Sequence, residues 1–373
     1  MVRNFQDQIA AVIKVVEAGR AVFASRHRWI PDLVRYTGLS PESIETSFHR
    51  HLELYPEVYH LEALVSSVQQ ASQIYVVLAS TVFTAPLRAL ASAYAAAPYV
   101  MIRPSRWEPV FASAIVEMMQ DPHLRITSEI PFEKIQSGEV HVYGHTETVN
   151  AIRRRSPPHV YVRGYGTGIG IAVIPFFADV VCREEMANAL AQDICAFDQR
   201  GCLSPRIAFV EGGVEQLHSF ADALHNALIQ YALKVPRGEL SVQEEQECTE
   251  YEITLRFLGK VWKGKEHLIG TVEDPTVSLF LAPPGRCIHL MPLEHLAQFP
   301  TRIAPLFSLV LTIGSPDPDA IRALVPPWIR LAKLGKIQSP PLDGPVDRRP
   351  PSIQYPPLLS NCPSADFLNM LCV

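Results

Sequence analysis

The residue best suited to covalent chemistry is Cys202, which lies in the segment Phe197-Asp198-Gln199-Arg200-Gly201-Cys202-Leu203-Ser204-Pro205. A glycine precedes it and the strand-like residues 207–210 follow, so we expect the thiol on a turn at the entrance to a strand. A cysteine thiolate can accept an acyl group as a thioester. A free cysteine also behaves as a small apolar residue and is common in protein cores. The position of Cys202 alone therefore leaves both interpretations open.

Four glycines lie upstream, at positions 164, 166, 168 and 170. Their spacing contains G-x-G-x-G, but a dinucleotide-binding fingerprint opens a helix at once and has an acidic residue about twenty positions later. The apolar residues 171–174 predict another strand instead,. We therefore reject a dinucleotide fingerprint here. The predicted order is strand, glycine turn, strand, helix, cysteine loop and strand.

Composition limits the classes of function. The 373 residues are 48% hydrophobic, enough for a large core and two domains,. The net charge of −5 leaves no general basic field for nucleic acid,. The seven cysteines are scattered without a C-x-x-C pair, which favours reduced thiols over disulfides and predicts no metal site,. Without an apolar run of about 18 residues or a signal-peptide pattern, we expect a cytoplasmic protein with no integral membrane span.

Hydrophobic periodicity predicts a helical segment followed by parallel β-α units. Residues 1–70 have helical spacing, with a helix start at Ser40-Pro41-Glu42-Ser43,. Apolar strands are predicted at 74–79 and 99–102, each followed by a helix, the second through Trp107, Phe111, Ile115 and Met118,. Ligands of such units bind at the carboxyl ends of the strands.

The rest of the chain predicts more strands and one long helix. An alternating strand and a glycine turn are predicted at 139–144, a helix at 214–231, and strands at 251–257, 287–290 and 308–311,. Prolines 350, 351, 356 and 357 predict an irregular tail,.

The segment from Val160 to Val210 resembles the acyl-CoA reductase family typified by the LuxC fatty-acid reductase component of bacterial luminescence, a branch of the aldehyde dehydrogenase superfamily. The resemblance covers roughly residues 70–350, and the blocks 198–205 and 335–342 are the most specific. It implies an α/β fold with a Rossmann-like parallel-sheet cofactor domain and a second α/β catalytic domain. We expect a helical segment at 1–70, a cofactor domain at 71–196 with part of 335–373, and a catalytic domain at 197–334.

The resemblance also implies roles for individual residues. It makes Cys202 the nucleophile. Arg106 stands where superfamily members carry an acid against the adenosine ribose, and an arginine there favours NADPH over NADH,. The implied cofactor-binding residues are Arg103, Ser105 and Arg106, the pyrophosphate-side turn Gly144, His145 and Thr146, and Gly164 beside the nicotinamide,.

Two departures from the superfamily pattern bear on the reaction. Thr81 stands where members carry an asparagine that stabilises the oxyanion, so its hydroxyl is the expected substitute,. The water-activating glutamate is replaced by Arg163 or Gly164. Without that base, we expect reduction of a long-chain acyl-CoA to a fatty aldehyde through an acyl-cysteine, with no hydrolysis to the acid.

Two other functions are compatible with the sequence. The acyl group could come from a carrier protein or an acyl-transferring partner, and a homo-oligomer is also compatible. Alternatively, the chain could be a binding protein that has lost turnover, since Thr81 is a departure and the tail is rich in proline. A gain of one acyl mass on incubation with an acyl thioester distinguishes an enzyme from a scaffold.

Overall fold

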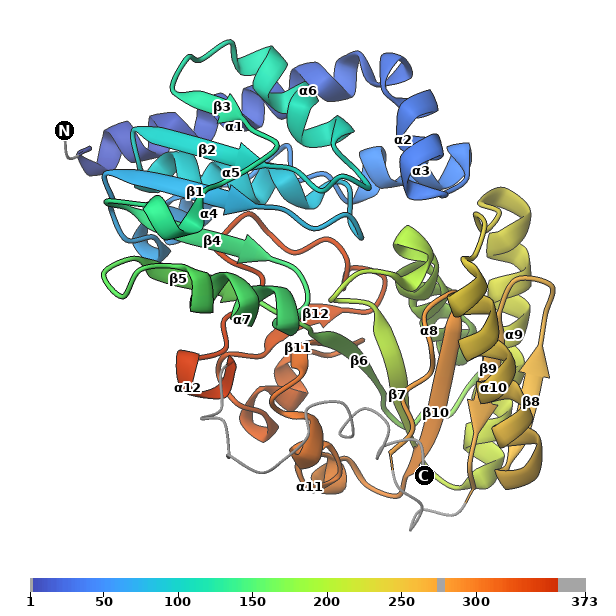
Figure 1. Cartoon of the computed structure of the whole chain (residues 1–373). Coiled ribbons are helices and arrows are strands. Elements are labelled where there is room, and N and C mark those ends of the chain that lie inside the picture. The colour runs from blue at the N-terminus through green and yellow to red at the C-terminus, as the bar shows by residue number, and fades with distance from the viewer. Residues whose placement is uncertain (1–2, 274–278, 355–373) are drawn as a thin grey trace. The chain divides into compact units, whose positions relative to one another are not determined.

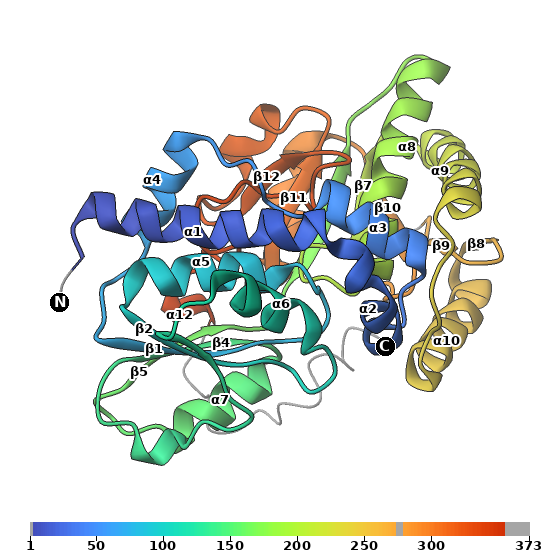
Figure 2. The same cartoon turned by 90° about the horizontal axis from the view of Figure 1, so that it is seen from above.

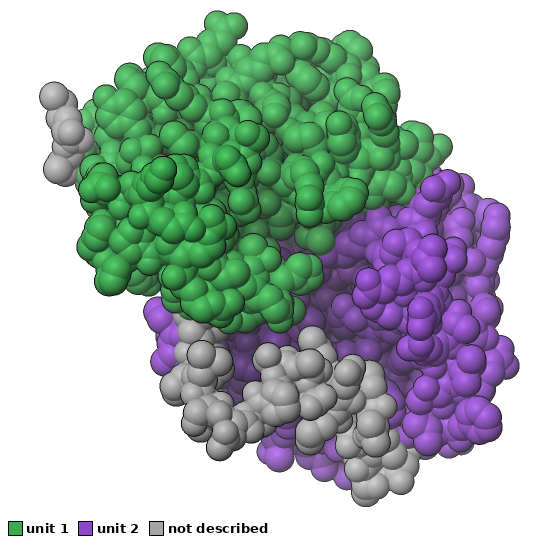
Figure 3. Space-filling view, in the orientation of Figure 1, with its two compact units in different colours: residues 1–167, 339–347 green, residues 168–338, 348–373 purple. Residues whose placement is uncertain are grey.

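The computed structural model describes residues 3–273 and 279–354 (Figure 1). These residues form two compact units, which Figure 3 colours separately. Among the described residues, unit 1 comprises 3–167 and 339–347, and unit 2 comprises 168–273, 279–338 and 348–354. Each unit is built around its own sheet.

The predicted helical segment at the start of the chain is confirmed. Its helices are α1 Phe5–Ala24, α2 Ile30–Thr37, α3 Pro41–Arg50 and α4 Val58–Ser67. The start of α3 is as predicted, because the Ser40 hydroxyl accepts a hydrogen bond from Ser43 N at 3.1 Å. Helix α1 packs along α5 Ala85–Ala96 and α6 Val110–Met119 (Figure 2).

The sheet of unit 1 has five parallel strands in the order β3-β2-β1-β4-β5. They are β1 Gln73–Val77, β2 Tyr99–Arg103, β3 Leu124–Ile126, β4 Glu139–Tyr143 and β5 Tyr161–Tyr165. Helices α5 and α6 lie on one face, and α7 Thr146–Arg155 lies on the other (Figure 2). The chain adds strands on one side of β1 and then returns to its other side. This reversal makes the carboxyl ends of β1 and β4 a topological switch point, where such sheets bind ligands.

The helix predicted through Trp107 begins later than expected. Helix α6 begins at Val110, and Trp107 lies in a turn where Ser105 forms a bridge with Glu108. The Trp107 side chain is 67% exposed, so its apolar character does not contribute to the helical core stripe.

Unit 2 contains a seven-stranded sheet in the order β12-β11-β6-β7-β10-β9-β8, with β8 antiparallel to β9 and the other neighbours parallel. Its strands are β6 Ile169–Ile174, β7 Pro205–Glu211, β8 Lys260–Lys263, β9 Leu268–Thr271, β10 Cys287–Leu293, β11 Val310–Ser315 and β12 Arg330–Lys333. Its α-helices are α8 Val180–Cys195, α9 Val214–Lys234, α10 Val242–Leu258, α11 Phe299–Ile303 and α12 Pro351–Gln354. Short 3-10 helices in the two units lie at Arg26–Arg28, Phe132–Lys134, Ala196–Gln199, Leu296–Gln298, Ala304–Leu306 and Asp319–Leu324.

The strand predicted at 251–257 is wrong, because these residues lie in α10. The helix buries Tyr251 and Leu255, which are four residues apart, and leaves Ile253 and Phe257 exposed. The alternation of large apolar residues therefore does not reflect alternating burial. A capping box formed by Ser241 and Glu244 starts this helix,.

Two expected boundaries differ from the structure. The sequence assigns residues 168–196 to the cofactor domain, whereas the compact units divide at Gly168, because β6 lies between β7 and β11 in the second sheet. The predicted irregular tail begins with the short helix α12, so Pro351 is helical. Pro356 and Pro357 lie outside the described residues.

Candidate active site

Cys202 lies on a turn between α8 and β7, and its side chain is exposed. Cys195, the cysteine nearest to Cys202 in the sequence, is buried at the end of α8 and is the other residue that could be considered as a nucleophile. Burial raises the pKa of the Cys195 thiol to about 12. Cys195 therefore stays protonated at neutral pH, whereas Cys202 is accessible to a substrate.

The backbone before Cys202 has an uncommon conformation. Phe197, Asp198 and Gln199 have φ angles of 52°, 49° and 65°, in the left-handed region. None of them is a glycine, and this conformation costs about 1–3 kcal/mol at each non-glycine residue. Such a turn persists only where surrounding contacts hold it.

Asp198 anchors the turn through a buried ion pair. Its side chain is fully buried, and Arg286 Nε and Nη2 lie 2.9 and 2.8 Å from Asp198 Oδ1. Asp198 Oδ2 accepts a hydrogen bond from Gly238 N at 2.9 Å, and the Asp198 carbonyl accepts one from Gly285 N at 3.2 Å. This residue therefore ties the turn to two other segments of unit 2.

Gln199 connects the turn to two strands. Its Oε1 accepts a hydrogen bond from Cys287 N at 2.7 Å, and its Nε2 donates to the carbonyls of Pro205, at 2.7 Å, and Cys287. The neighbouring Arg200 lies 2.7 Å from Glu244 at the start of α10. Burial raises the pKa of Glu244, but the hydrogen bonds from Arg200 and Ser241 and the positive charge of Arg200 together outweigh it and leave that pKa lowered. Glu244 is therefore ionised at neutral pH and fixes Arg200.

The residues after Cys202 are held against β6 and the C-terminal part of unit 2. Gly170 N donates to the Ser204 carbonyl at 2.9 Å, and a Cβ on Gly170 would lie 2.0 Å from the Leu203 carbonyl oxygen. Only glycine permits this close approach. The Ser204 hydroxyl accepts a hydrogen bond from Gln338 Nε2 at 2.8 Å. The two most specific blocks of the sequence thus meet at Ser204 and Gln338.

In unit 1, most of the predicted cofactor residues lie at one edge of the sheet. Thr81 follows β1 and is exposed, Arg103 ends β2, and Ser105 and Arg106 follow it. Gly144, His145 and Thr146 follow β4, where His145 is the residue before the first turn of α7. The strands are parallel, so their carboxyl ends share an edge. Gly164 differs, because it lies inside β5 opposite Val142 and is buried.

The two predicted arginines have different surroundings. The Arg103 guanidinium is half-buried, 5.7 Å from the centre of the Phe132 ring, and burial together with nearby Arg155 lowers its pKa. Arg106 is exposed, and its guanidinium is 5.6 Å from the Trp107 ring centre. Arg106 therefore combines an accessible positive charge with an exposed indole.

The start of α7 is suited to an anion. No side chain caps the helix at His145, so its first-turn amides are left for other acceptors, apart from a 3.5 Å contact from Thr146 N to the Thr167 hydroxyl. A Cβ on Gly166 would lie 2.8 Å from the Thr146 hydroxyl, which shows how closely this segment approaches the helix start. Free amides at a helix start bind phosphate groups.

The sequence interpretation missed Arg286 as part of the site. Arg286 is distant from Cys202 along the chain and belongs to no motif, although it is a charged residue immediately before the apolar strand β10. Within the described residues, three or more His, Cys, Asp or Glu side chains nowhere form a group that could hold a metal. In the same part of the chain, each helix is too short or too polar to cross a membrane.

Comparison with known proteins identifies relatives of the chain. The family model of the acyl-CoA reductases (LuxC) matches residues 62–316. A long-chain acyl-protein thioester reductase of Aliivibrio fischeri is 30% identical over 149 residues, which are 40% of this chain and 30% of that protein. The protein of that name from Photorhabdus laumondii is 26% identical over 179 residues, 48% of this chain and 36% of its own length. The matched stretch thus spans about a third of these relatives.

Solved structures identify the fold. An oxidoreductase from Marinobacter aquaeolei superposes with a TM-score of 0.64 at 12% identity, over 87% of this chain and 75% of that one. A putative aldehyde dehydrogenase from Burkholderia cenocepacia gives a TM-score of 0.63 at 14% identity, over 83% and 72% of the two chains. The predicted aldehyde dehydrogenase-like α/β fold is confirmed. The family match extends over more than half of the sequence, and the chain belongs to the acyl-CoA reductase (LuxC) family.

Proposed function

We propose that this protein reduces a long-chain acyl thioester to a fatty aldehyde, with Cys202 as the nucleophile and NADPH as the source of hydride. The observation that carries the proposal is the exposed Cys202 thiol on a turn whose preceding residues are anchored by buried contacts. A rigid, accessible thiol is suited to nucleophilic catalysis. The chain also belongs to a family of reductases.

Cys202 carries the covalent steps of the proposed reaction. Its thiolate attacks the acyl carbonyl carbon, the bond from that carbon to the leaving thiol breaks, and the acyl group stays on Cys202 as a thioester. A reduced nicotinamide, when bound, supplies the hydride that adds to the same carbon. The Cys202–carbon bond of the resulting thiohemiacetal then breaks, which releases the aldehyde and restores the thiolate. The Cys202 backbone N–H is one proposed donor to the developing oxyanion, and Thr81 is the other.

The absence of a positioned base in β5 favours reduction over hydrolysis in this proposal. Position 163 carries an arginine, and its guanidinium lies 3.6 Å from Glu139. The same Glu139 oxygen, Oε2, also lies 3.2 Å from His141 Nε2, so it already has two partners. Without a base to activate water, the acyl-enzyme waits for hydride.

The proposed cofactor site is the carboxyl edge of the unit 1 sheet. The start of α7, with Gly144, His145 and Thr146, suits the pyrophosphate,. Gly164, which is buried one residue before the end of β5, is assigned to the nicotinamide side by the family resemblance alone. The exposed Arg106 would pair with the 2′-phosphate that distinguishes NADPH from NADH,. Arg103 and Ser105 complete the proposed adenosine side.

The names of the relatives point to two kinds of acyl donor. The family description names an acyl-CoA, whereas the curated relatives are named for an acyl-protein donor. We propose acyl-CoA as the donor. A carrier protein or an acyl-transferring partner is the alternative that the relatives' names favour. We place the reaction in the cytoplasm, where scattered cysteines stay reduced.

Intact-mass spectrometry tests the proposal. Incubation with a long-chain acyl-CoA should add one acyl group to the wild-type protein and none to Cys202→Ser, which lacks a thiolate at neutral pH. Adding NADPH should then remove the acyl group and release the aldehyde. A wild-type protein that gains no mass from acyl-CoA, from an acylated carrier or from an acylated partner would be a binding protein. Thr81→Ala tests the second oxyanion donor through the acylation rate.

A further inference from the structure

We infer that Asp198 and Arg286 are positioning residues that fix Cys202 for acyl transfer. The inference rests on the proposed role of Cys202 as the nucleophile. Its basis is the buried ion pair between these two side chains, because Asp198 is itself part of the left-handed turn that precedes Cys202. Neither residue is exposed, with 0% and 1% of their surfaces accessible, so neither can contact a substrate.

The backbone on both sides of the ion pair is unusual. Asp198 is the middle residue of the three consecutive left-handed residues 197–199. Opposite it, Gly285 and Arg286 have φ angles of 96° and 68°. The Gly285 amide donates to the Asp198 carbonyl, and the Arg286 side chain pairs with the Asp198 carboxylate. Two strained turns therefore hold each other, and strain of this kind is concentrated at functional sites.

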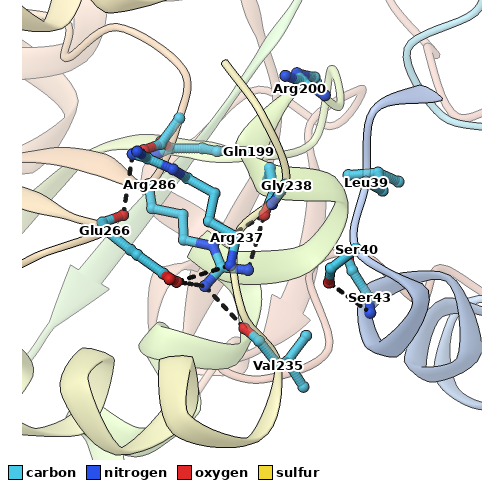
Figure 4. Close-up of polar contacts among 12 residues, drawn as sticks. Leu39, Ser40, Ser43, Gln199, Arg200, Val235, Arg237, Gly238, Glu266 and Arg286 are labelled. Carbon is cyan, nitrogen blue, oxygen red and sulfur yellow. Dashed lines mark hydrogen bonds and ion pairs between the residues drawn. The ribbon is translucent and has the colours of Figure 1, made fainter. Parts of the chain in front are cut away.

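A wider charge network fixes Arg286 itself (Figure 4). Arg286 Nη1 donates to the Val235 carbonyl at 3.0 Å and lies 3.4 Å from Glu266 Oε2. The same oxygen of Glu266 accepts from Arg237 N at 2.7 Å, and Arg237 Nη1 donates to the Gly285 carbonyl at 3.0 Å. Arg286 is thus held from the segment after α9 and from the loop before β9.

The stability of the fold does not by itself explain why an ion pair is buried between Asp198 and Arg286. Burying an ion pair costs solvation, and well-packed apolar residues of similar volume are often equally stabilising. Here the Asp198 carboxylate accepts from Gly238 N and the Arg286 guanidinium donates to the Val235 carbonyl, so the pair ties both turns to the backbone after α9, which apolar side chains could not do. We therefore assign the pair to the geometry of the Cys202 turn. A displacement of about 1 Å at a reacting group can lower a rate about a hundredfold.

A double substitution separates positioning from stability. Arg286→Met leaves the buried Asp198 carboxylate without its cation, and Asp198→Asn leaves Arg286 with only the longer pair to Glu266, so each single variant should have a lower thermal unfolding midpoint. Asp198→Asn combined with Arg286→Met removes both charges and should recover most of that loss. We expect the double variant nevertheless to acylate about a hundredfold more slowly than wild type at saturating acyl-CoA. Recovery of both stability and the wild-type acylation rate would overturn the inference.

Two further single variants test the positioning role even if the double variant does not fold. Arg286→Lys retains the buried charge but lacks the guanidinium geometry, so it should fold and still acylate slowly. If the double variant does not fold, a wild-type acylation rate in Arg286→Lys would overturn the inference. Glu252→Gln removes the ion pairs of Glu252 on α10 with Arg256 and with Lys263 on β8, which lie outside this network, and should leave the acylation rate unchanged.

The rate at which iodoacetamide alkylates Cys202, measured from pH 6 to pH 10, separates failure of the positioning role from failure of the proposed reductase activity. If acyl-CoA does not acylate wild type, the proposed function fails, but alkylation still compares the thiol between variants. An alkylation rate and pH midpoint unchanged in both the double variant and Arg286→Lys would overturn the positioning role, whether or not the reductase activity is found.

Discussion

Substitution of Gly170 by alanine should displace the turn that carries Cys202. The new Cβ would lie 2.0 Å from the Leu203 carbonyl oxygen and 2.8 Å from the Leu203 carbonyl carbon. Ordinary contact begins at 3.4 Å, so the two backbones must separate by at least 1.4 Å. Strand β6 is held between β7 and β11, so most of the movement falls on the turn. Leu203 follows Cys202 directly, and the thiol must move with it.

The displacement sets the expected magnitudes. Overpacking of this kind costs about 1–3 kcal/mol of unfolding free energy. A shift near 1 Å at the reacting thiol should lower the acylation rate about a hundredfold. Gly170→Ala should therefore lose much more activity than its loss of stability accounts for, because at about 25 °C the remaining protein is still folded.

The assay combines urea unfolding with acyl incorporation followed by mass spectrometry. Gly213→Ala is the matched control, since Gly213 also lies in unit 2 and no atom lies within 4 Å of its added Cβ. It should acylate at the wild-type rate. The reasoning would be refuted by a Gly170→Ala variant that loses stability as expected but acylates as fast as wild type, because the position of the Leu203 carbonyl would then not control the thiol.

Three further outcomes are expected. Arg106→Glu should raise the KM for NADPH roughly ten- to a hundredfold, the effect of a lost charge-assisted hydrogen bond, and the KM for NADH much less; equal changes with both cofactors would make Arg106 merely structural. Burial raises the pKa of Glu108 from 4.5 to about 7, so the folded state binds the proton more tightly, and the free energy of unfolding should fall by about 2 kcal/mol from pH 5 to pH 7.5,. Glu108→Gln keeps an acceptor for Phe111 N and should remove this part of the slope in urea unfolding; an unchanged slope would mean that Glu108 does not titrate there. Without NADPH, labelled acyl-Cys202 should persist, since general-base catalysis of hydrolysis is worth about a hundred- to ten-thousandfold; rapid release of free fatty acid would reveal a base.

Local signals predicted the strands of the unit 1 sheet well. The continuous apolar runs of β1 and β2 and the glycine after β4 are properties of short segments, and each predicted its element within a few residues. The shared carboxyl edge then follows from parallel pairing alone. Whether Arg106 or Thr146 contacts a cofactor stays a prediction, because it depends on a bound molecule.

Residues 251–257 were predicted as a strand because their large apolar residues alternate, whereas the helix-start signal upstream of them was not considered. Tyr251, Ile253, Leu255 and Phe257 alternate, but only the two residues four apart are buried. The capping box at Ser241 precedes this segment and predicts a helix from the sequence alone,. The short edge strand β8 carries exposed lysines at both ends, so its sequence has no clear apolar signal.

The anchoring of the Cys202 turn could not be predicted, because it depends on contacts between distant residues. Asp198 and Arg286 are separated by 88 positions and meet because β10 pairs with β7. The left-handed backbone at 197–199 has no glycine to mark it. The sequence shows residues 198–205 as a motif around a cysteine, but it does not show that Arg286 stabilises the turn before that cysteine.

The choice of residues in this turn has a physical reason. Glycines would adopt the left-handed angles at little cost, but a glycine turn has no side chains to hold it and remains mobile. Asp198 and Gln199 adopt strained left-handed angles, but their side chains form contacts that stabilise the turn. Asp198 pairs with Arg286, and Gln199 bonds the backbone of Cys287. The identity of these two residues therefore fixes the backbone that presents the thiol. This accounts for a specific Asp-Gln pair before the cysteine where turn geometry alone would favour glycine.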